Sequence, residues 1–200
     1  MVVQRRTRGR DGVRVALTEA AREVLIQAGY DGLTIRRVAE RAEYSLGTVY
    51  GYFADKDDLL YALVREDFAL LTERLRSIRD SHVGAVAVRE MLLSYVEMGL
   101  ERPQSYEIMF MLKPKLASRN ASDESDEHAY AIFRGCIVAA MRRGEFRYDD
   151  PDVLAQMLWA SVHGLVSLRL TLSDFPWGEM TRLAETLVDA ELRGLAPAAT

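Results

Sequence analysis

Side chains that can bind a polyanion are concentrated between residues 33 and 56. Hydroxyl-bearing, tyrosine and cationic residues recur there at short intervals, with apolar residues between them. Hydroxyls and tyrosines can donate hydrogen bonds to phosphate oxygens, and a threonine methyl group can touch the methyl group of thymine. The residues that we expect to contact DNA are Thr34, Arg36, Ser45, Leu46, Gly47, Thr48, Tyr50, Tyr52 and Lys56.

Two short helices joined by a tight turn would position these side chains. Thr34 and Ser45 are suitable N-caps for the two helices. Gly47 leaves space near the start of the second helix, and Lys56 lies in the first turn of the next one, which favours phosphate binding. This pattern predicts a helix-turn-helix over residues 34–53, whose second helix can enter a major groove. The packing residues that we expect are Val38, Ala39, Ala42, Val49 and Phe53.

The same segment resembles the N-terminal domain of TetR-family transcriptional regulators. The resemblance rests on Thr34-Ile-Arg-Arg-Val-Ala-Glu-Arg-Ala, Ser45-Leu-Gly-Thr-Val-Tyr-Gly-Tyr-Phe and Asp55-Lys-Asp-Asp-Leu-Leu, and covers residues 12–62. It implies a homodimer that binds a palindromic operator in double-stranded DNA and releases it when a small molecule enters the C-terminal domain. It also implies that Arg36 and Thr48 contact bases or lie near them. The phosphate contacts that it implies are those of Thr34, Tyr50, Tyr52 and Lys56.

Three positions depart from the family pattern. Glu43-Tyr44 occupies the turn where the family commonly has Gly-Val, so Glu43 must adopt whatever backbone angle the turn imposes. Leu46 replaces a frequent Lys or Arg, and Gly51 replaces a larger side chain. The reading face of the second helix is therefore uncharged. We expect Arg36 and a basic N-terminal arm to supply much of the electrostatic affinity, with the arm in a minor groove or, alternatively, as a solvated tail; the arm comprises Arg5, Arg6, Arg8 and Arg10.

Composition and charge favour a soluble helical protein with two parts. The chain has 200 residues, 49% of them hydrophobic, and a net charge of −4. Its first 56 residues carry +3 and the remainder −7, which predicts a basic DNA-binding domain over 1–56 and an acidic effector-binding and dimerisation domain over 57–200. The single cysteine, Cys136, is compatible with a reducing cytosol. No run of about 18 apolar residues occurs, so we expect a cytoplasmic protein without a membrane span.

Helical periodicity dominates the whole chain, so the expected fold is all-α, with about nine helices. Gly29 would end the first helix, Asp55 would cap the fourth, and residues 114–122 read as a loop. The expected helices are 12–28, two short ones after Thr34 and Ser45, a long one from Asp55 to about Arg79, and 84–101, 103–112, 123–143, 151–172 and 178–193.

Aromatic and methionine side chains on the helices of the second part could line an adaptable apolar cavity. For any one of these side chains, ordinary core packing is the simpler interpretation. Taken together with the family resemblance, the whole set predicts a pocket for a small, largely apolar effector. The residues expected to line it are Tyr95, Met98, Met109, Phe110, Tyr130, Phe133, Trp159 and His163.

The segment 151–172 is apolar nearly all round, which predicts burial on two faces. With the segment 178–193 it could form a four-helix bundle across a two-fold axis. The spacing of Trp159 and His163-Gly164 is similar to that of the WHG type of C-terminal domain in this family. The expected dimer-interface residues are Met157, Ser161, Gly164, Leu168, Leu183 and Leu187.

Catalysis, metal binding and cofactor binding are not expected. His82, His128 and His163 are far apart in the sequence, and no metal-ligand spacing, phosphate loop or nucleophile elbow occurs. Two alternatives to a ligand-released repressor stay open. One is an activator or ligand-independent DNA binder of the same fold. The other is a protein-interaction or small-molecule-binding module that has lost DNA binding, an alternative that the departures at Glu43, Leu46 and Gly51 leave open.

Overall fold

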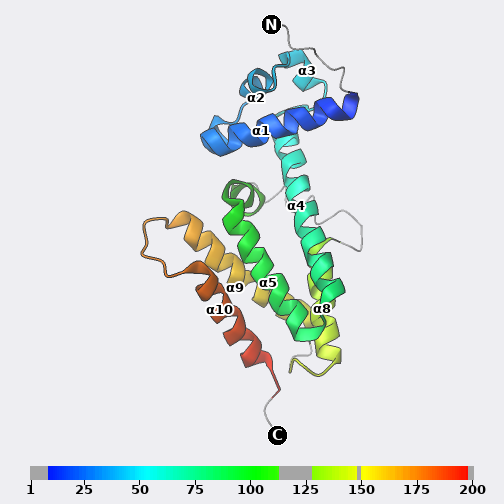
Figure 1. Ribbon diagram of the computed structural model, residues 1–200, viewed down its shortest axis with the longest axis vertical. Helices are drawn as coiled ribbons and strands as arrows, with labels where there is room; N and C mark the ends of the chain where they lie inside the picture. The colour runs from blue at the N-terminus through cyan, green and yellow to red at the C-terminus, as the bar shows by residue number, and fades with distance from the viewer. Residues whose placement is uncertain (1–8, 113–127, 148–149, 198–200) are drawn as a thin grey trace. The chain divides into compact units, whose positions relative to one another are not determined.

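The computed structural model describes residues 9–112, 128–147 and 150–197. Within these ranges the chain is built of helices without any strand (Figure 1), so the all-α prediction is confirmed. The chain divides into two compact units between Glu66 and Asp67, inside helix α4. The first unit therefore includes the beginning of α4, beyond the boundary at residue 56 that the charge pattern predicts.

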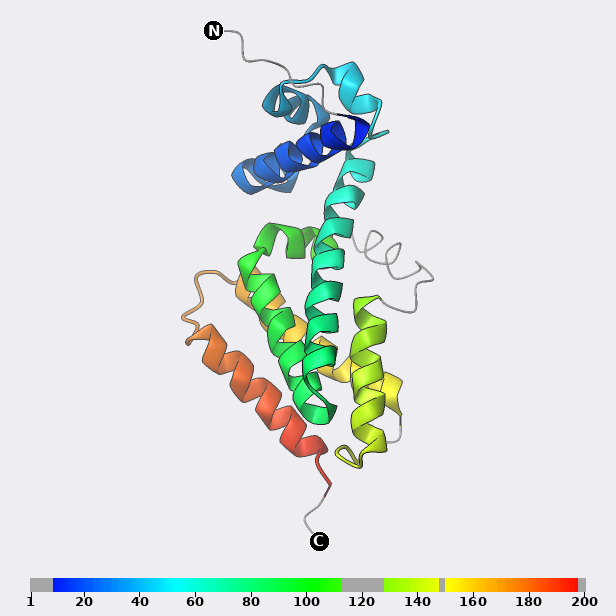
Figure 2. The ribbon, with the colours of Figure 1, turned by 45° about the vertical axis from the view of Figure 1, so that its right-hand side comes forward.

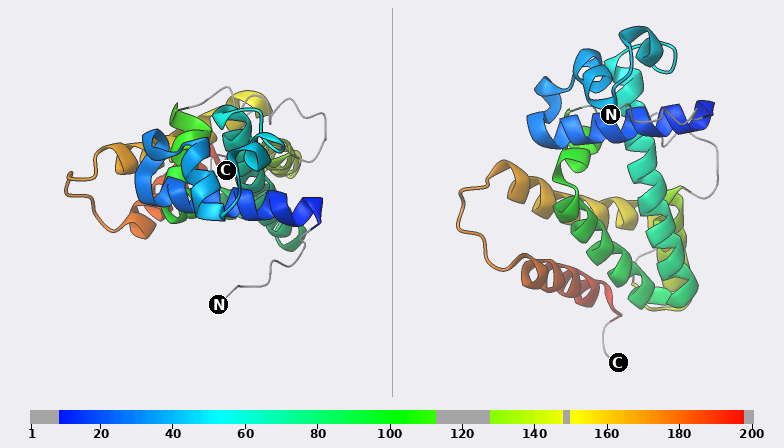
Figure 3. Two further views of the ribbon diagram at one scale, coloured as in Figure 1. Left: turned by 90° about the horizontal axis from the view of Figure 1, so that it is seen from above. Right: turned by 45° about the horizontal axis from the view of Figure 1, so that its top comes forward.

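The first unit contains α1 (Arg10–Gly32), α2 (Ile35–Ala42), α3 (Leu46–Tyr50) and the start of α4 (Lys56–Ser81). α2 packs against both α1 and α3, and α2 and α3 lie on the same side of α1 (Figure 3). The side chains that hold the three helices together are fully buried, as the helix-turn-helix pattern predicts for Val38, Val49 and Phe53.

All three expected N-caps are confirmed. Thr34 Oγ1 accepts from the Arg37 amide at 3.2 Å, and Ser45 Oγ accepts from the Thr48 amide at 3.0 Å. Asp55 Oδ1 accepts from the Asp58 amide at 2.8 Å. Each cap satisfies an amide at the start of a helix that has no partner within the helix, so each fixes where its helix begins.

The first helix is longer at both ends than the expected 12–28. Gly29 does interrupt it, with φ 67° and ψ −175°, a conformation that glycine adopts without strain. One further turn follows to Gly32, and the Leu33 amide donates to the carbonyls of Gly29 and Tyr30. The sequence signal at Gly29 therefore marks a kink, and the helix ends three residues later.

The second unit contains the rest of α4, α5 (Gly84–Glu101), α6 (Pro103–Tyr106), the π-helix η1 (Glu107–Leu112), α8 (Ala129–Arg142), α9 (Pro151–Thr171) and α10 (Met180–Leu195). α5 is central, packing against α8, α9 and α10 (Figure 2). Ion pairs lie along these contacts: Arg89 with Asp189 joins α5 to α10, and Arg134 with Asp152 joins α8 to α9.

Two expected helix boundaries are wrong, and one expected helix is of a different type. The segment 103–112 is helical over the expected range, but only its first turn is α-helix and Glu107–Leu112 is a π-helix. α8 begins at Ala129, where the His128 side chain caps it; residues 123–127 and the expected loop 114–122 lie outside the described residues. α10 continues to Leu195, which is buried and whose carbonyl accepts from the Arg147 amide, so the chain is still packed there.

Of the described helices, α9 alone is long and apolar enough to cross a membrane by length and composition. This is weak evidence for a span, because core helices of soluble proteins pass the same test. Gln156, His163 and Arg169 interrupt its apolar surface, and its side chains Leu154, Leu158 and others are buried against neighbouring helices. α9 is thus buried on one side, while Met157, Trp159 and Leu168 are exposed.

Candidate DNA-reading surface and interior cavity

The first candidate site is the surface formed by α2, α3 and the start of α4. Six of the nine side chains expected to contact DNA are exposed there: Thr34, Arg36, Ser45, Leu46, Gly47 and Tyr50. Thr48, Tyr52 and Lys56 are half-buried. Leu46 and Tyr50 are the large apolar or aromatic members, with 46% and 57% of their surface exposed. About half of each of these side chains is therefore accessible to a partner.

A shallow hollow brings part of this set together. Thr34, Arg36, Leu46, Tyr50 and Lys56 line it, with Asp31, Leu33, Ile35, Ala54 and Asp55. The other four expected residues (Ser45, Gly47, Thr48 and Tyr52) lie outside it. The hollow therefore combines residues from the end of α1 and from α2, α3 and the start of α4, which are separate parts of the sequence.

The two cations among the expected DNA contacts already have partners. Arg36 Nε donates to Glu40 Oε1 at 3.1 Å within α2. Lys56 Nζ donates to the Tyr30 carbonyl at 2.6 Å and lies 3.9 Å from the centre of the Tyr30 ring. An ammonium group has three donors, so Lys56 can still bind a phosphate, but its position is fixed by α1. On α3 the Ser45 and Thr48 hydroxyls lie 2.8 Å apart and hydrogen-bond to each other.

The turn between α2 and α3 has the strained geometry that Glu43 must tolerate. Glu43 has φ 58° and ψ 36°, the one non-glycine residue with positive φ among the described residues. The Tyr44 amide donates to the Ala39 carbonyl at 3.0 Å, which closes the end of α2. Glycine adopts this left-handed region freely, and Asn or Asp at a reduced cost; Glu43 has a steric cost there, so the turn holds its shape at the expense of stability.

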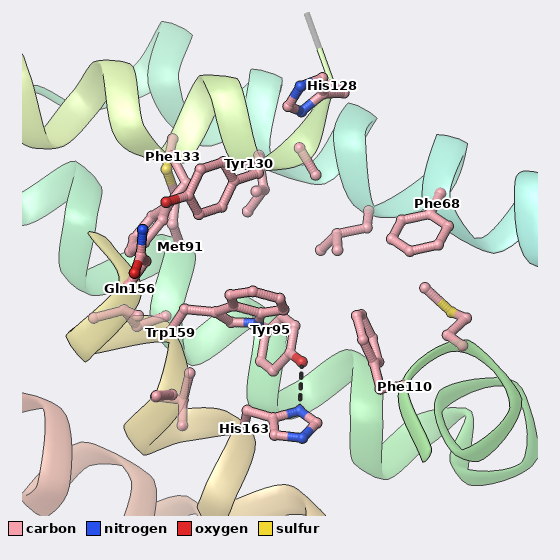
Figure 4. Close-up of a pocket in the computed structure, with 17 residues that line it drawn as sticks. Phe68, Met91, Tyr95, Phe110, His128, Tyr130, Phe133, Gln156, Trp159 and His163 are labelled. Atoms are coloured by element: carbon pink, nitrogen blue, oxygen red, sulfur yellow. Dashed lines mark hydrogen bonds between the residues drawn. The ribbon is translucent and has the colours of Figure 1, made fainter. Parts of the chain in front are cut away.

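The second candidate site is a cavity of about 820 Å³ within the second unit, formed by α4, α5, η1, α8 and α9. Seven of the eight side chains expected to line a pocket do line it: Tyr95, Met109, Phe110, Tyr130, Phe133, Trp159 and His163. Figure 4 shows the rings of Phe68, Phe110, Tyr130 and Trp159 placed around one common space. Met98 is the exception, because its side chain is packed in the core and is not part of the cavity wall.

A chain of hydrogen bonds fixes the polar groups at one side of the cavity. Tyr95 Oη donates to Tyr106 Oη at 3.2 Å, and Tyr106 Oη lies 2.6 Å from His163 Nδ1. Burial raises the pKa of the Tyr95 hydroxyl to about 12 and raises that of Tyr106 further, so both phenols keep their protons. Burial also lowers the pKa of His163, which favours a neutral imidazole. The consistent assignment has Tyr106 donating to Nδ1, with the histidine proton on Nε2.

Several wall residues are not apparent from sequence patterns. Phe68 comes from α4, and Met91 from α5, where a core position and a cavity position look alike. Gln156 and His128 add polar atoms, and His128 Nδ1 accepts from the Ala131 amide at 3.2 Å. The π-helix η1 carries Phe110, and π-helical turns are often found at functional sites, but their register cannot be read from side-chain periodicity.

The α9–α10 face contains the residues expected at a dimer interface. Met157 and Leu168 are exposed, and Ser161, Gly164, Leu183 and Leu187 are half-buried. Ser161 Oγ donates to Glu191 Oε2 at 2.8 Å, and burial raises the pKa of that carboxyl group. The apolar sequence of α9 predicts burial of this face, but within this chain no other described helix covers it. Its surface combines apolar side chains with the small residues Ser161 and Gly164.

In the part of the chain that the structure describes, no group of three or more His, Cys, Asp or Glu residues could hold a metal ion. Cys136 is a buried thiol, and burial raises its pKa.

The chain is similar to known regulators along most of its length. Residues 17–63 match the family described as "Bacterial regulatory proteins, tetR family", and residues 88–194 match the family described as "Tetracyclin repressor-like, C-terminal domain". The HTH-type transcriptional repressor AcnR of Corynebacterium diphtheriae is 30% identical over 159 residues, covering 77% of this chain and 79% of the relative. An HTH-type transcriptional repressor of Mycobacterium tuberculosis is 34% identical over 172 residues, covering 82% and 84%.

Solved structures share the fold. The transcriptional regulator FadR of Bacillus subtilis, crystallised in complex with stearoyl-CoA, superposes with a TM-score of 0.74 at 18% sequence identity, covering 90% of this chain and 98% of that chain. At this identity the likeness shows the architecture alone.

Proposed function

The chain belongs to the tetR family of bacterial regulatory proteins, and on that premise we propose that it is a homodimeric repressor whose operator DNA is released when a small molecule binds. The observation that carries the proposal is the presence in one chain of an exposed α2–turn–α3 surface and a separate apolar cavity. Its relatives are transcriptional regulators, a class that is generally not enzymatic. A cytoplasmic location follows from the proposed role.

The proposed DNA contacts follow the exposure and chemistry of the reading surface. Leu46 and Thr48 reach base edges, because residues at the start of a recognition helix are the ones that enter the groove. Arg36, exposed at the start of α2, reaches base edges from beside that helix. Thr34, Ser45, Tyr50, Tyr52 and Lys56 bind phosphates, and Gly47 lets the backbone approach the DNA. Phosphate contacts set the position of the helix, while base contacts select the sequence.

The proposed dimer uses the α9–α10 face. Two copies of this face form a four-helix bundle in which Gly164 and Ser161 allow close approach and Met157, Leu168, Leu183 and Leu187 lose their exposed apolar surface. A two-fold dimer requires a palindromic operator whose half-sites are separated by about one turn of DNA, roughly 34–36 Å.

The proposed effector occupies the cavity of the second unit. It must bind the DNA-incompetent state more tightly than the competent one, and a tenfold release of operator requires about 1.4 kcal/mol of coupling. α4 belongs to both compact units, so we expect it to carry a shift of the cavity wall to the reading surface. Phe68 on α4 lines the cavity directly, which gives the effector a contact on that helix.

The test is selection of random duplex DNA by the purified protein at about 150 mM salt, near the physiological value. Recovery of one palindromic motif supports a sequence-specific dimer. Recovery of unrelated sequences, or a non-palindromic motif bound by a monomer, would contradict the proposal. Thr48→Ala and Tyr50→Ala should each weaken binding to the selected operator, and Ile26→Ala, an exposed change on α1, should not.

A further inference from the structure

The cavity wall carries no formal charge. None of the 17 described residues that line it is an aspartate, glutamate, lysine or arginine (Figure 4). The two histidines are the titratable bases among them. Burial lowers the pKa of His163, which favours its neutral form, and His128 Nδ1 accepts from the Ala131 amide. A bound molecule would therefore meet no counter-ion among these residues.

The buried polar atoms at one side of the wall are already hydrogen-bonded. Tyr95, Tyr106 and His163 satisfy one another, and within the described chain no buried side-chain nitrogen or oxygen lacks a hydrogen-bond partner. A charged group held against this wall would lose hydration without gaining an ion pair from the 17 described residues, and that loss is expensive in an apolar site. A neutral ligand has no such penalty, so the wall selects against charge.

The shape of the wall is set by rings that meet edge to face or at a tilt. Phe110 lies 5.8 Å from Phe68, 5.8 Å from Tyr95 and 6.2 Å from Trp159, measured between ring centres. Tyr130 lies 6.0 Å from Trp159 in a tilted arrangement. Ring edges and faces of this kind pack well against another aromatic ring, and the flexible side chains of Met91 and Met109 can adjust to its outline.

We propose that the cavity takes an uncharged, aromatic ligand of two or more rings and rejects the same skeleton when it carries an anionic group. This inference rests on the proposed function for its regulatory meaning, since it names the class of the effector. Binding itself is a property of the cavity and can be measured without DNA.

The experiment uses two fluorescent probes with one ring skeleton. N-phenyl-1-naphthylamine is neutral, and 8-anilino-1-naphthalenesulfonate adds a single sulfonate. Each is titrated into the full-length protein at neutral pH. We expect the neutral probe to bind at least about tenfold more tightly, which corresponds to about 1.4 kcal/mol. Equal or tighter binding of the sulfonate in the cavity would overturn the proposal, as would a failure of the neutral probe to bind.

Two pairs of variants show where the probes bind and why. Ala160→Trp fills the cavity and should abolish binding of the neutral probe, while Val86→Trp, on an exposed position of α5 outside the cavity, should not. Gln156→Lys places a cation at an exposed part of the wall and should reduce the ratio by which the neutral probe binds more tightly than the sulfonate. Gln156→Met has a side chain of similar length to lysine but no charge, and should leave that ratio unchanged. Circular dichroism checks that each variant is folded.

Operator release is measured separately, with DNA from the selection experiment. Suppose that the neutral probe binds selectively, but that the protein either binds no operator or is not released from it by the probe. The inference on ligand class then stands and the proposed function fails. If anionic ligands release the operator while neutral aromatic ones do not, the proposed function stands and the inference fails.

Discussion

Recognition of thymine methyl groups by Leu46 is the most direct prediction for the reading surface. Leu46 is the first residue of α3 and is 46% exposed, at a position where the family frequently has a cation. An apolar side chain at the edge of a major groove has one specific partner, the C5-methyl group of thymine. We therefore expect the selected operator to carry a thymine in each half-site opposite Leu46.

The expected magnitude follows from the exposed area. Leu46→Ala removes three carbon atoms, and about 0.8 kcal/mol is gained per buried methylene group. Since about half of the residue is free to be buried, the loss is about 1 kcal/mol per half-site, or about fivefold in Kd. Replacing the contacted thymine by deoxyuridine removes one methyl group and should cost about threefold to fourfold per half-site.

Fluorescence anisotropy with the selected operator measures both changes. In the Leu46→Ala protein the thymine and deoxyuridine operators should bind equally well, because the partner of the methyl group is gone. The salt dependence should not change, since no charge is removed. Ile26→Ala, an exposed apolar truncation on α1, is the matched control. If every deoxyuridine operator bound the wild-type protein as tightly as the thymine form, the assignment of Leu46 to base reading would be refuted.

Three further predictions concern strain, the cavity network and pH. Glu43→Gly should raise the free energy of unfolding by about 0.5–1 kcal/mol, because glycine accepts φ 58° without steric cost, whereas Glu43→Ala should give no such gain in a urea titration. Tyr106→Phe should lower the thermal midpoint by a few degrees, because it removes the buried hydroxyl that donates to His163, a bond worth about 1 kcal/mol. The raised pKa of Glu191 means that its contribution to stability is full below about pH 4.5 and is lost as the pH rises through the folded-state value. Glu191→Gln should remove this loss in thermal melts from pH 4 to pH 8, and the exposed Glu185→Gln on the same helix should leave it in place.

Much of the fold could be predicted because its signals are local. N-cap side chains mark the starts of α2, α3 and α4, and the resemblance to the TetR family is confirmed. Boundaries that depend on distant contacts could not be predicted. α10 extends to Leu195 because the Arg147 amide bonds to that residue's carbonyl, and the π-helical register at Glu107 leaves no trace in the apolar spacing.

The cavity was partly predictable for a similar reason. Aromatic residues on α8 and α9 stand out in the sequence, but Met98 and Met91 lie on the same helix with the same chemistry, and only packing decides that Met91 lines the cavity while Met98 does not. Phe68 was missed because α4 reads as a connecting helix. The hydrogen bonds between Tyr106 and His163 join residues 57 positions apart, which no local pattern contains.

Glu40 should restrain DNA binding through its ion pair with Arg36. α3 has no charged residue, and Lys56 already donates to the Tyr30 carbonyl, so the electrostatic affinity of the described reading surface depends mainly on the exposed arginines of α2, of which Arg36 is the expected DNA contact. Its Nε donates to Glu40 Oε1 at 3.1 Å, and an exposed pair of this kind within a helix is worth only a few tenths of a kcal/mol. Glu40→Gln should therefore cost little stability, yet it removes a negative charge beside the DNA and should tighten operator binding at 150 mM salt. In an Arg36→Ala background the gain should shrink. An equal gain in both backgrounds would mean that Glu40 repels the phosphates directly and that its pairing with Arg36 is irrelevant to binding.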